Sequence, residues 1–346
     1  MAPFRVVMVT NDMPPTPAWV ARQLQENGIA FTENLCTRPQ EVKEAAADAD
    51  VVWLFGGTPG VVTAEVLPHL RRCRAILRTG TGTDNVPVRE ATRLGILVAN
   101  TPEATAHAVS EHAIGLLFAV LRQIAVQDRA IRQGTWDRYR AWPNWHMVGQ
   151  TLGLLGFGRI ARLVVKKTYG FELKVIAHDP GVDAKTMHAA GVEPVSLEEL
   201  LRRADFLSIH LPLHETTRHL IGERELRQMK PHAVLINTSR GAVVDEHALV
   251  RALSERWIAA AGLDVLEQEP PAPEHPLLGM DNVVLTPHIA GYSDEFLPNF
   301  WGHSVRTLIE MSRNRLPLWW VNPSAHPRWE PAPHPESGQH SEPTRT

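Results

Sequence analysis

The sequence has few cysteines, little net charge and no long hydrophobic run. Cys36 and Cys73 are the only two cysteines in 346 residues, and their spacing fits neither a zinc site nor a disulfide framework. We therefore expect two reduced thiols in the core and no bound metal. The net charge of −3 excludes the basic surface that nucleic-acid binding requires.

No stretch approaches the roughly 18 consecutive apolar residues of a transmembrane helix. The N-terminal sequence MAPFRVVMVTND has too short an apolar part for a signal peptide and is typical of a first β-strand. We therefore expect a cytoplasmic protein with neither a membrane nor a nucleic acid as partner. At about 150 residues per domain, the length predicts two domains.

The clearest motif is a glycine turn in TLGLLGFGRIA, residues 151–161. It contains G-x-G-x-x-A, formed by Gly156, Gly158 and Ala161. In dinucleotide-binding folds the first glycine makes a tight turn, the second lets the backbone approach a pyrophosphate, and the small third residue lets helix pack on strand. Asp179 ends the next predicted strand, at about the 20-residue offset of an acid that binds the adenine ribose. No arginine follows Asp179 directly, which favours NAD over NADP.

Strands and helices alternate on both sides of this motif, which predicts an α/β protein with two doubly wound parallel-sheet domains. We expect a nucleotide-binding (Rossmann) domain at residues 105–290, inserted into a flavodoxin-like substrate domain at 1–104 and 291–322. Helices are predicted from about residue 63, at 105–133 and at 305–313, the last of which returns to the substrate domain. The Pro-, His- and Ser-rich residues 323–346 predict a disordered tail.

The predicted helix 105–133 carries two histidines, and a cluster of tryptophans follows it. His107 and His112 lie on this helix, the latter next to Glu111, and we expect them to be structural rather than catalytic. Trp136, Trp142 and Trp145 are expected to be anchors of an interface or of the core, because aromatic side chains carry much packing area.

Polar residues follow the predicted strands of the second domain at the sheet edge where a dinucleotide binds. Hydride transfer needs one group that moves the hydroxyl proton and one cation that holds the anionic end of the substrate. His288 suits the first role and Arg240 the second. A carboxylate that orients His288 comes from the loop after the preceding strand, where Glu269 is the candidate and Glu267 the competing choice.

Several motifs in order resemble the D-isomer-specific 2-hydroxyacid dehydrogenase family. They are NTSRG at 237–241, DVLEQEP at 264–270 and TPHIAG at 286–291, with RTGTGTDN at 78–85 and NTP at 100–102 closest to the phosphoglycerate dehydrogenase branch. The resemblance implies an oxidoreductase that transfers a hydride between NAD(H) and C2 of a small D-2-hydroxy or 2-keto acid. It also implies a homodimer, and a catalytic set formed by Arg240, Glu269 and His288.

The resemblance and the glycine turn together give the remaining site residues. The cofactor contacts are expected at Thr81, Gly156, Gly158, Arg159, Ile160, Asp179, Leu211, Pro212, Thr238, Ser239, Arg240, Asp264, His288 and Gly291. The substrate contacts are expected at Gly56, Gly57, Gly80, Thr81 and Arg240. On pattern alone, the glycine turns at 56–60 and 79–85 are equally typical of tight turns without a ligand.

Two other functions fit the same fold. An NAD(H)-sensing, corepressor-like binding protein would keep the glycine fingerprint but would not need a proton-transfer set. An NAD-dependent hydrolase would hold its cofactor permanently. The set of Arg240, Glu269 and His288 favours the dehydrogenase over the sensor.

Overall fold

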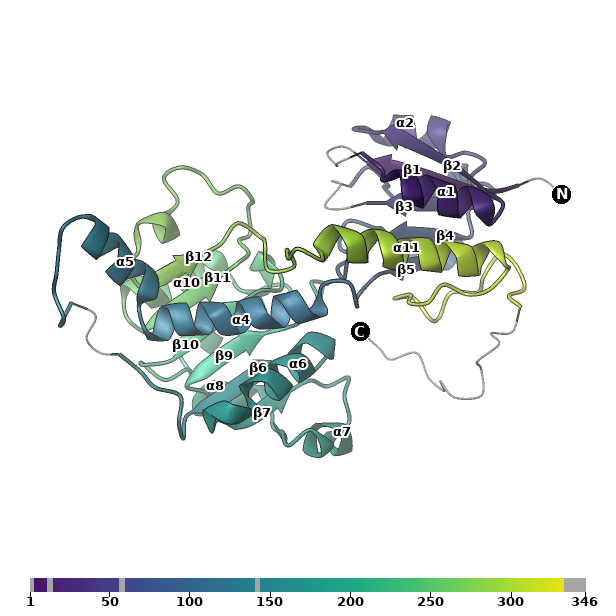
Figure 1. Ribbon diagram of the computed structural model, residues 1–346. Helices are drawn as coiled ribbons and strands as arrows, with labels where there is room; N and C mark the ends of the chain where they lie inside the picture. The colour runs from purple at the N-terminus through teal and green to yellow at the C-terminus, as the bar shows by residue number, and fades with distance from the viewer. Residues whose placement is uncertain (1–2, 11–14, 56–59, 141–143, 333–346) are drawn as a thin grey trace. The chain divides into compact units, whose positions relative to one another are not determined.

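The computed structural model describes residues 3–10, 15–55, 60–140 and 144–332. The chain divides into two compact units (Figure 1). Unit 1 comprises Met1–Thr105 and Asp294–Thr346, and unit 2 comprises Ala106–Ser293. Each unit is built on one parallel sheet with helices on both faces, which confirms the predicted fold class.

The sheet of unit 1 has five parallel strands. Their order is β2 (Ile29–Leu35), β1 (Phe4–Thr10), β3 (Val51–Leu54), β4 (Ala75–Arg78) and β5 (Leu97–Asn100). The order 2-1-3-4-5 is that of flavodoxin-like folds. Because side chains alternate along a strand, β1 directs Val6 and Met8 into one core cluster and Val7 and Val9 into the other.

Helices supply the two core clusters of unit 1. One face of the sheet packs against α1 (Ala18–Glu26) and α11 (Phe296–Ser312), and the other against α2 (Pro39–Ala45), α3 (Val88–Arg93) and the 3₁₀ helix η1 (Leu67–His69). The helix predicted from about residue 63 is therefore only the short η1, because Pro68 has no N–H to donate. Helix α11 begins at Phe296, before the predicted start at residue 305. Pro298 does not prevent this, because it lies in the first turn, where a missing N–H is tolerated.

The segment 323–332 packs on unit 1. Ala325 is buried, and the Arg328 guanidinium donates hydrogen bonds to the carbonyl oxygens of Leu70 and Leu94. This differs from the prediction of a disordered tail from residue 323, because composition does not reveal hydrogen bonds to residues more than 230 positions away. The rest of the predicted tail, 333–346, lies outside the described residues.

The sheet of unit 2 has seven parallel strands. Their order is β12 (Val283–Leu285), β11 (Ala260–Leu263), β10 (Val234–Asn237), β9 (Phe206–Ile209), β6 (Thr151–Leu155), β7 (Lys174–His178) and β8 (Glu193–Pro194). The strand order reverses between β6 and β9. In open α/β sheets a ligand binds outside the carboxyl ends of the strands at such a reversal.

The helices of unit 2 cover both faces of its sheet. One face packs against α4 (Ala106–Leu121), α6 (Arg159–Thr168) and α7 (Ala184–Ala189), and the other against α8 (Leu197–Arg203), α9 (Glu223–Leu226) and α10 (Glu246–Ser254). Short 3₁₀ helices complete the unit: η2 (Tyr169–Phe171), η3 (Gly241–Val243) and η4 (Pro276–Gly279).

The predicted helix 105–133 is two helices, α4 and α5 (Ile124–Arg132), which meet at an angle of 60°. Gln123 adopts a left-handed conformation with φ of 49°, which interrupts the helical hydrogen bonds between them. Within the described ranges no single helix has the length and apolar composition of a membrane span, and α4 with α5 meets those criteria only as this bent pair. The same residues contain no group of three or more His, Cys, Asp or Glu side chains placed to hold a metal ion.

Candidate active site

The glycine turn joins β6 to α6 at the carboxyl edge of the unit 2 sheet. Gly156 has φ of +91°, and a Cβ there would lie 2.9 Å from the carbonyl oxygen of His210, so only glycine fits. Gly158 is the N-cap of α6, and a Cβ there would meet no atom within 4 Å. The N-terminus of α6 therefore faces open space and offers its backbone N–H groups to an anion.

Asp179 lies beside this turn at the end of β7. Its Oδ2 accepts from the Phe157 amide at 2.8 Å, and its Oδ1 accepts from the Gly181 amide at 2.8 Å. Each carboxylate oxygen keeps a lone pair for a further donor. His210 follows β9, which lies on the opposite side of β6 from β7. Burial lowers the pKa of His210 to about 4, so this imidazole is neutral at physiological pH.

The loop after β10 carries Thr238, Ser239 and Arg240. The carbonyl of Arg240 accepts from Asn237 Nδ2 at 2.9 Å, which ties the loop to the strand end. A Cβ on Gly241 would lie 2.0 Å from the carbonyl carbon of Leu266, so the glycine lets this loop approach the loop after β11. Arg240 and Glu269, two members of the predicted catalytic set, therefore lie on loops that contact each other.

Asp264 ends β11 and organises the turn that carries His288. Its Oδ1 accepts from Thr286 Oγ1 at 2.6 Å and from the Ile289 amide at 2.9 Å, and its Oδ2 accepts from the Ala290 amide at 2.8 Å. Its backbone carbonyl accepts from the His288 amide at 2.8 Å. These bonds hold His288 in a left-handed conformation with φ of 54°. Thr286 also contacts His112 of α4, a histidine expected to be structural because it lies next to Glu111.

His288 and Glu269 are in direct contact. The imidazole Nδ1 lies 2.6 Å from Glu269 Oε2, while Glu269 Oε1 accepts from the Leu266 amide at 3.0 Å. Burial acts to raise the pKa of Glu269, but the His288 hydrogen bond and charge, the Leu266 amide and the charge of Arg240 together hold this pKa below its usual range. Glu269 is therefore an ionised carboxylate against the imidazole at neutral pH.

Glu267, the competing candidate, has other partners. Its Oε1 lies 2.9 Å from His219 Nε2 and accepts from the Glu246 amide at 3.0 Å. The structure thus brings Glu269 to His288 and Glu267 to His219.

The remaining predicted substrate residues belong to unit 1. The Gly80 amide donates to Thr101 Oγ1 at 2.7 Å, and the Gly80 carbonyl accepts from the Thr101 amide at 3.0 Å. The Gly80 N–H thus has a partner inside the unit, and Gly80 stays a predicted substrate contact. Thr81 remains a predicted contact, and Gly56 and Gly57 lie outside the described residues.

Comparison with known proteins shows which family the chain resembles. Residues 114–290 match the model of the D-isomer specific 2-hydroxyacid dehydrogenase, NAD binding domain. The chain is 42% identical over 319 residues to a glyoxylate reductase of Korarchaeum cryptofilum, covering 88% of this chain and 95% of that protein.

Two solved structures extend the comparison. A glyoxylate reductase from Paecilomyes thermophila has a TM-score of 0.83 at 30% identity over 92% of this chain and 98% of its own. The acyclic imino acid reductase Bsp5, in complex with NADPH and D-Arg, has a TM-score of 0.81 at 28% identity over 91% of this chain and 99% of its own.

The fold, the strand-end residues and these similarities define an oxidoreductase that uses a nicotinamide dinucleotide. The chain belongs to the D-isomer specific 2-hydroxyacid dehydrogenase family. The predicted family and enzyme class are therefore confirmed, whereas the preference for NAD over NADP stays a prediction.

The residues of unit 2 fit such a cofactor. Among the residues that the structure describes, Thr238 Oγ1 is buried at the end of β10 and has no hydrogen-bond partner, as expected for a hydroxyl that faces a ligand. Gly158 leaves the N-terminus of α6 open, and Asp179 retains acceptor capacity beside it. These three residues are placed to hold a polar dinucleotide along the carboxyl edge of the sheet.

Proposed function

We propose that this protein catalyses hydride transfer between NAD(H) and C2 of a small 2-keto or D-2-hydroxy acid, with glyoxylate and related 2-keto acids as first candidates. The observation that carries the proposal is the 2.6 Å contact between His288 Nδ1 and Glu269 Oε2 at the edge where the dinucleotide binds. Glyoxylate comes from the names of the similar reductases.

His288 exchanges the proton of the substrate oxygen. Glu269 engages Nδ1, so Nε2 is the nitrogen that donates a proton to the keto oxygen in reduction and removes it from the hydroxyl in oxidation. The His288 side chain is 46% exposed, so the imidazole is not enclosed by the protein. The bound nicotinamide supplies or accepts the hydride itself.

Arg240 and Glu269 support His288 in different ways. Arg240 binds the substrate carboxylate, because a guanidinium matches the geometry of a carboxylate with two parallel hydrogen bonds. Glu269 orients the imidazole and stabilises its protonated form by its negative charge.

Asp179 makes NAD the preferred cofactor. Its carboxylate would repel the 2′-phosphate of NADP, and the following residues, Pro180, Gly181 and Val182, offer no cation to that phosphate.

The experiment that tests this function is NADH oxidation with a panel of 2-keto acids, run in parallel with NADPH. The panel contains glyoxylate, hydroxypyruvate, pyruvate, phenylpyruvate, and branched and phosphorylated keto acids. Turnover with one of them and faster rates with NADH are expected. Tight NADH binding without turnover of any keto acid would favour a sensor, and faster rates with NADPH would contradict the role of Asp179.

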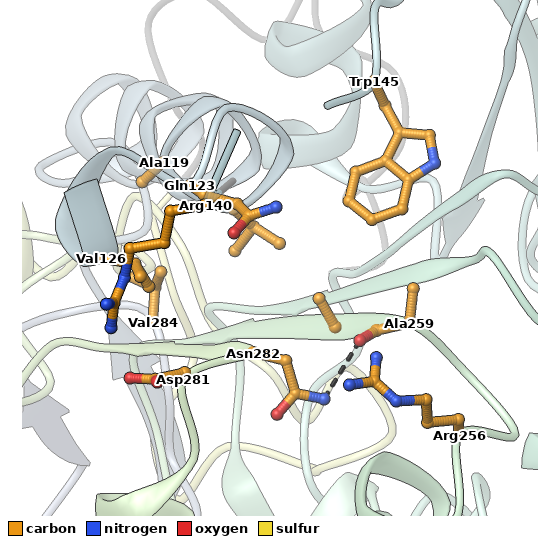
Figure 2. A pocket seen from close by; sticks show the side chains of 12 residues that line it. Ala119, Gln123, Val126, Arg140, Trp145, Arg256, Ala259, Asp281, Asn282 and Val284 are labelled. Carbon is orange, nitrogen blue, oxygen red and sulfur yellow. Dashed lines mark hydrogen bonds between the residues drawn. The ribbon is translucent and has the colours of Figure 1, made fainter. Parts of the chain in front are cut away.

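We propose that a second copy of this chain binds the face formed by α5 and the segment that follows it. Trp136 and Tyr139 are 78% and 80% exposed, and Ile124 and Ile131 on α5 are more than half exposed. A cavity of about 340 Å³ lies beside Gln123 and Val126, and Figure 2 shows Arg140, Trp145 and Arg256 around it. The exposed apolar side chains suit the self-complementary contact of a twofold dimer.

Replacing Trp136 tests this dimer. Trp136→Glu places a charge where an apolar side chain would be buried, so we expect light scattering at micromolar concentration to report a dimer for the parent and a monomer for the variant. Trp19→Glu is the matched control, because Trp19 is also exposed, at 43%, but lies on α1 of unit 1. A monomeric parent, or a variant as dimeric as the control, would contradict the proposal.

A further inference from the structure

His112 joins α4 to the turn that carries the catalytic histidine. Its Nε2 lies 2.9 Å from Thr286 Oγ1 and 3.6 Å from Asp264 Oδ1. Thr286 Oγ1 in turn lies 2.6 Å from Asp264 Oδ1. Helix α4 packs against β10, β11 and β12, so the imidazole reaches the turn from a rigid element of the core.

The direction of each hydrogen bond follows from the chemistry of the three groups. An ionised carboxylate only accepts, so the single hydroxyl proton of Thr286 goes to Asp264. The hydroxyl oxygen must then accept from His112, whose Nε2 carries a proton in this arrangement. The Asp264 carboxylate also accepts the amides of Ile289 and Ala290, on the far side of His288. A continuous chain of donors and acceptors thus runs from α4 to both sides of His288.

We infer that His112 is a positioning residue for the hydride-transfer reaction. It fixes the Thr286 hydroxyl, and through it the Asp264 carboxylate that holds His288 at φ of 54°. A left-handed backbone at a non-glycine residue persists only where its surroundings enforce it. Loss of the His112 bond leaves the Thr286 oxygen without its donor and releases one end of this chain. A catalytic group displaced by even about 1 Å can lose on the order of 100-fold in rate.

The inference rests on the proposed function and is tested with His112→Leu, His112→Gln and Thr286→Val. His112→Leu is expected to lower kcat for keto-acid reduction about tenfold, with KM and the Kd for NADH changed less than twofold, because the loss concerns only the transition state. His112→Gln keeps an N–H donor toward Thr286 and should recover kcat to within about threefold of the parent. Thermal unfolding of each variant shows that it is folded.

The double variant separates a coupled chain from two independent structural effects. His112 and Thr286 act through one another, so His112→Leu with Thr286→Val should lose no more kcat than the more damaging single change. Additive losses, or a His112→Leu enzyme with the kcat of the parent, would overturn the inference. If His112→Leu fails to fold, Thr286→Val tests the same inference, because it removes the hydroxyl that contacts both His112 and Asp264.

A measurement without turnover distinguishes failure of the inference from failure of the proposed function. The imidazole resonance of His288, assigned by its loss in His288→Asn, should shift in His112→Leu and Thr286→Val but not in His112→Gln. If the parent reduces none of the keto acids, the proposed function fails and the resonance still decides the role of His112. An unmoved resonance in an active parent background rejects His112 as a positioning residue and leaves the function in place.

Discussion

The His288→Asn variant is expected to reduce 2-keto acids about 100 to 10,000 times more slowly than the parent, the range that general acid–base catalysis contributes. Asparagine tolerates the left-handed backbone of this position, φ of 54°, so the turn is retained while the proton donor is lost. Affinity for NADH, measured by fluorescence, should fall far less than turnover, because His288 is only one of the expected cofactor contacts and Asp179, Gly156 and Gly158 are untouched.

A matched control comes from a second histidine paired with a carboxylate. His275 Nε2 lies 2.9 Å from Glu246 Oε1, a separation close to that of the His288 pair. His275 directly precedes the 3₁₀ helix η4 and is not among the predicted site residues. His275→Asn should therefore keep the turnover of the parent. Full turnover of keto acids by His288→Asn would contradict the role of His288 as the proton donor.

The strands were the most predictable part of the fold. The N-terminal sequence MAPFRVVMVTND predicts a first β-strand, and the structure has β1 at Phe4–Thr10. Helix ends depend on backbone conformation that single-residue patterns do not encode. Gln123 is an ordinary helix residue by propensity, yet its left-handed conformation divides the predicted helix 105–133 into α4 and α5.

The candidate site was predictable in its residue types but not in its pairings. Both Glu267 and Glu269 lie in one loop after β11, and no local pattern says which carboxylate reaches His288 across 19 residues. Two features determine which carboxylate reaches His288: the close approach of Gly241 to Leu266, and the contacts of Glu267 with His219 and Glu246. The contact of His112 with Thr286 could not be predicted for the same reason, because it spans 174 residues.

The Glu269→Gln variant is expected to move the alkaline limb of keto-acid reduction to lower pH. Reduction requires protonated His288, so its rate falls where the imidazole deprotonates. The ionised carboxylate 2.6 Å away favours the imidazolium, and its own pKa is held below the usual range, so it remains charged along this limb. Glutamine removes the charge, the imidazolium becomes less stable, and deprotonation occurs at lower pH. The measurement is kcat/KM for reduction against pH.

Glu267→Gln is the matched control, two residues away in the same loop. Its carboxylate contacts His219 at 2.9 Å and the Glu246 amide at 3.0 Å, so its removal should leave the midpoint of the limb in place. A limb that moves with Glu267→Gln and not with Glu269→Gln would transfer the supporting role to Glu267. The oxidation of the hydroxy acid supplies an independent check, because it requires unprotonated His288. Its rising limb should therefore shift to lower pH in Glu269→Gln by the same amount.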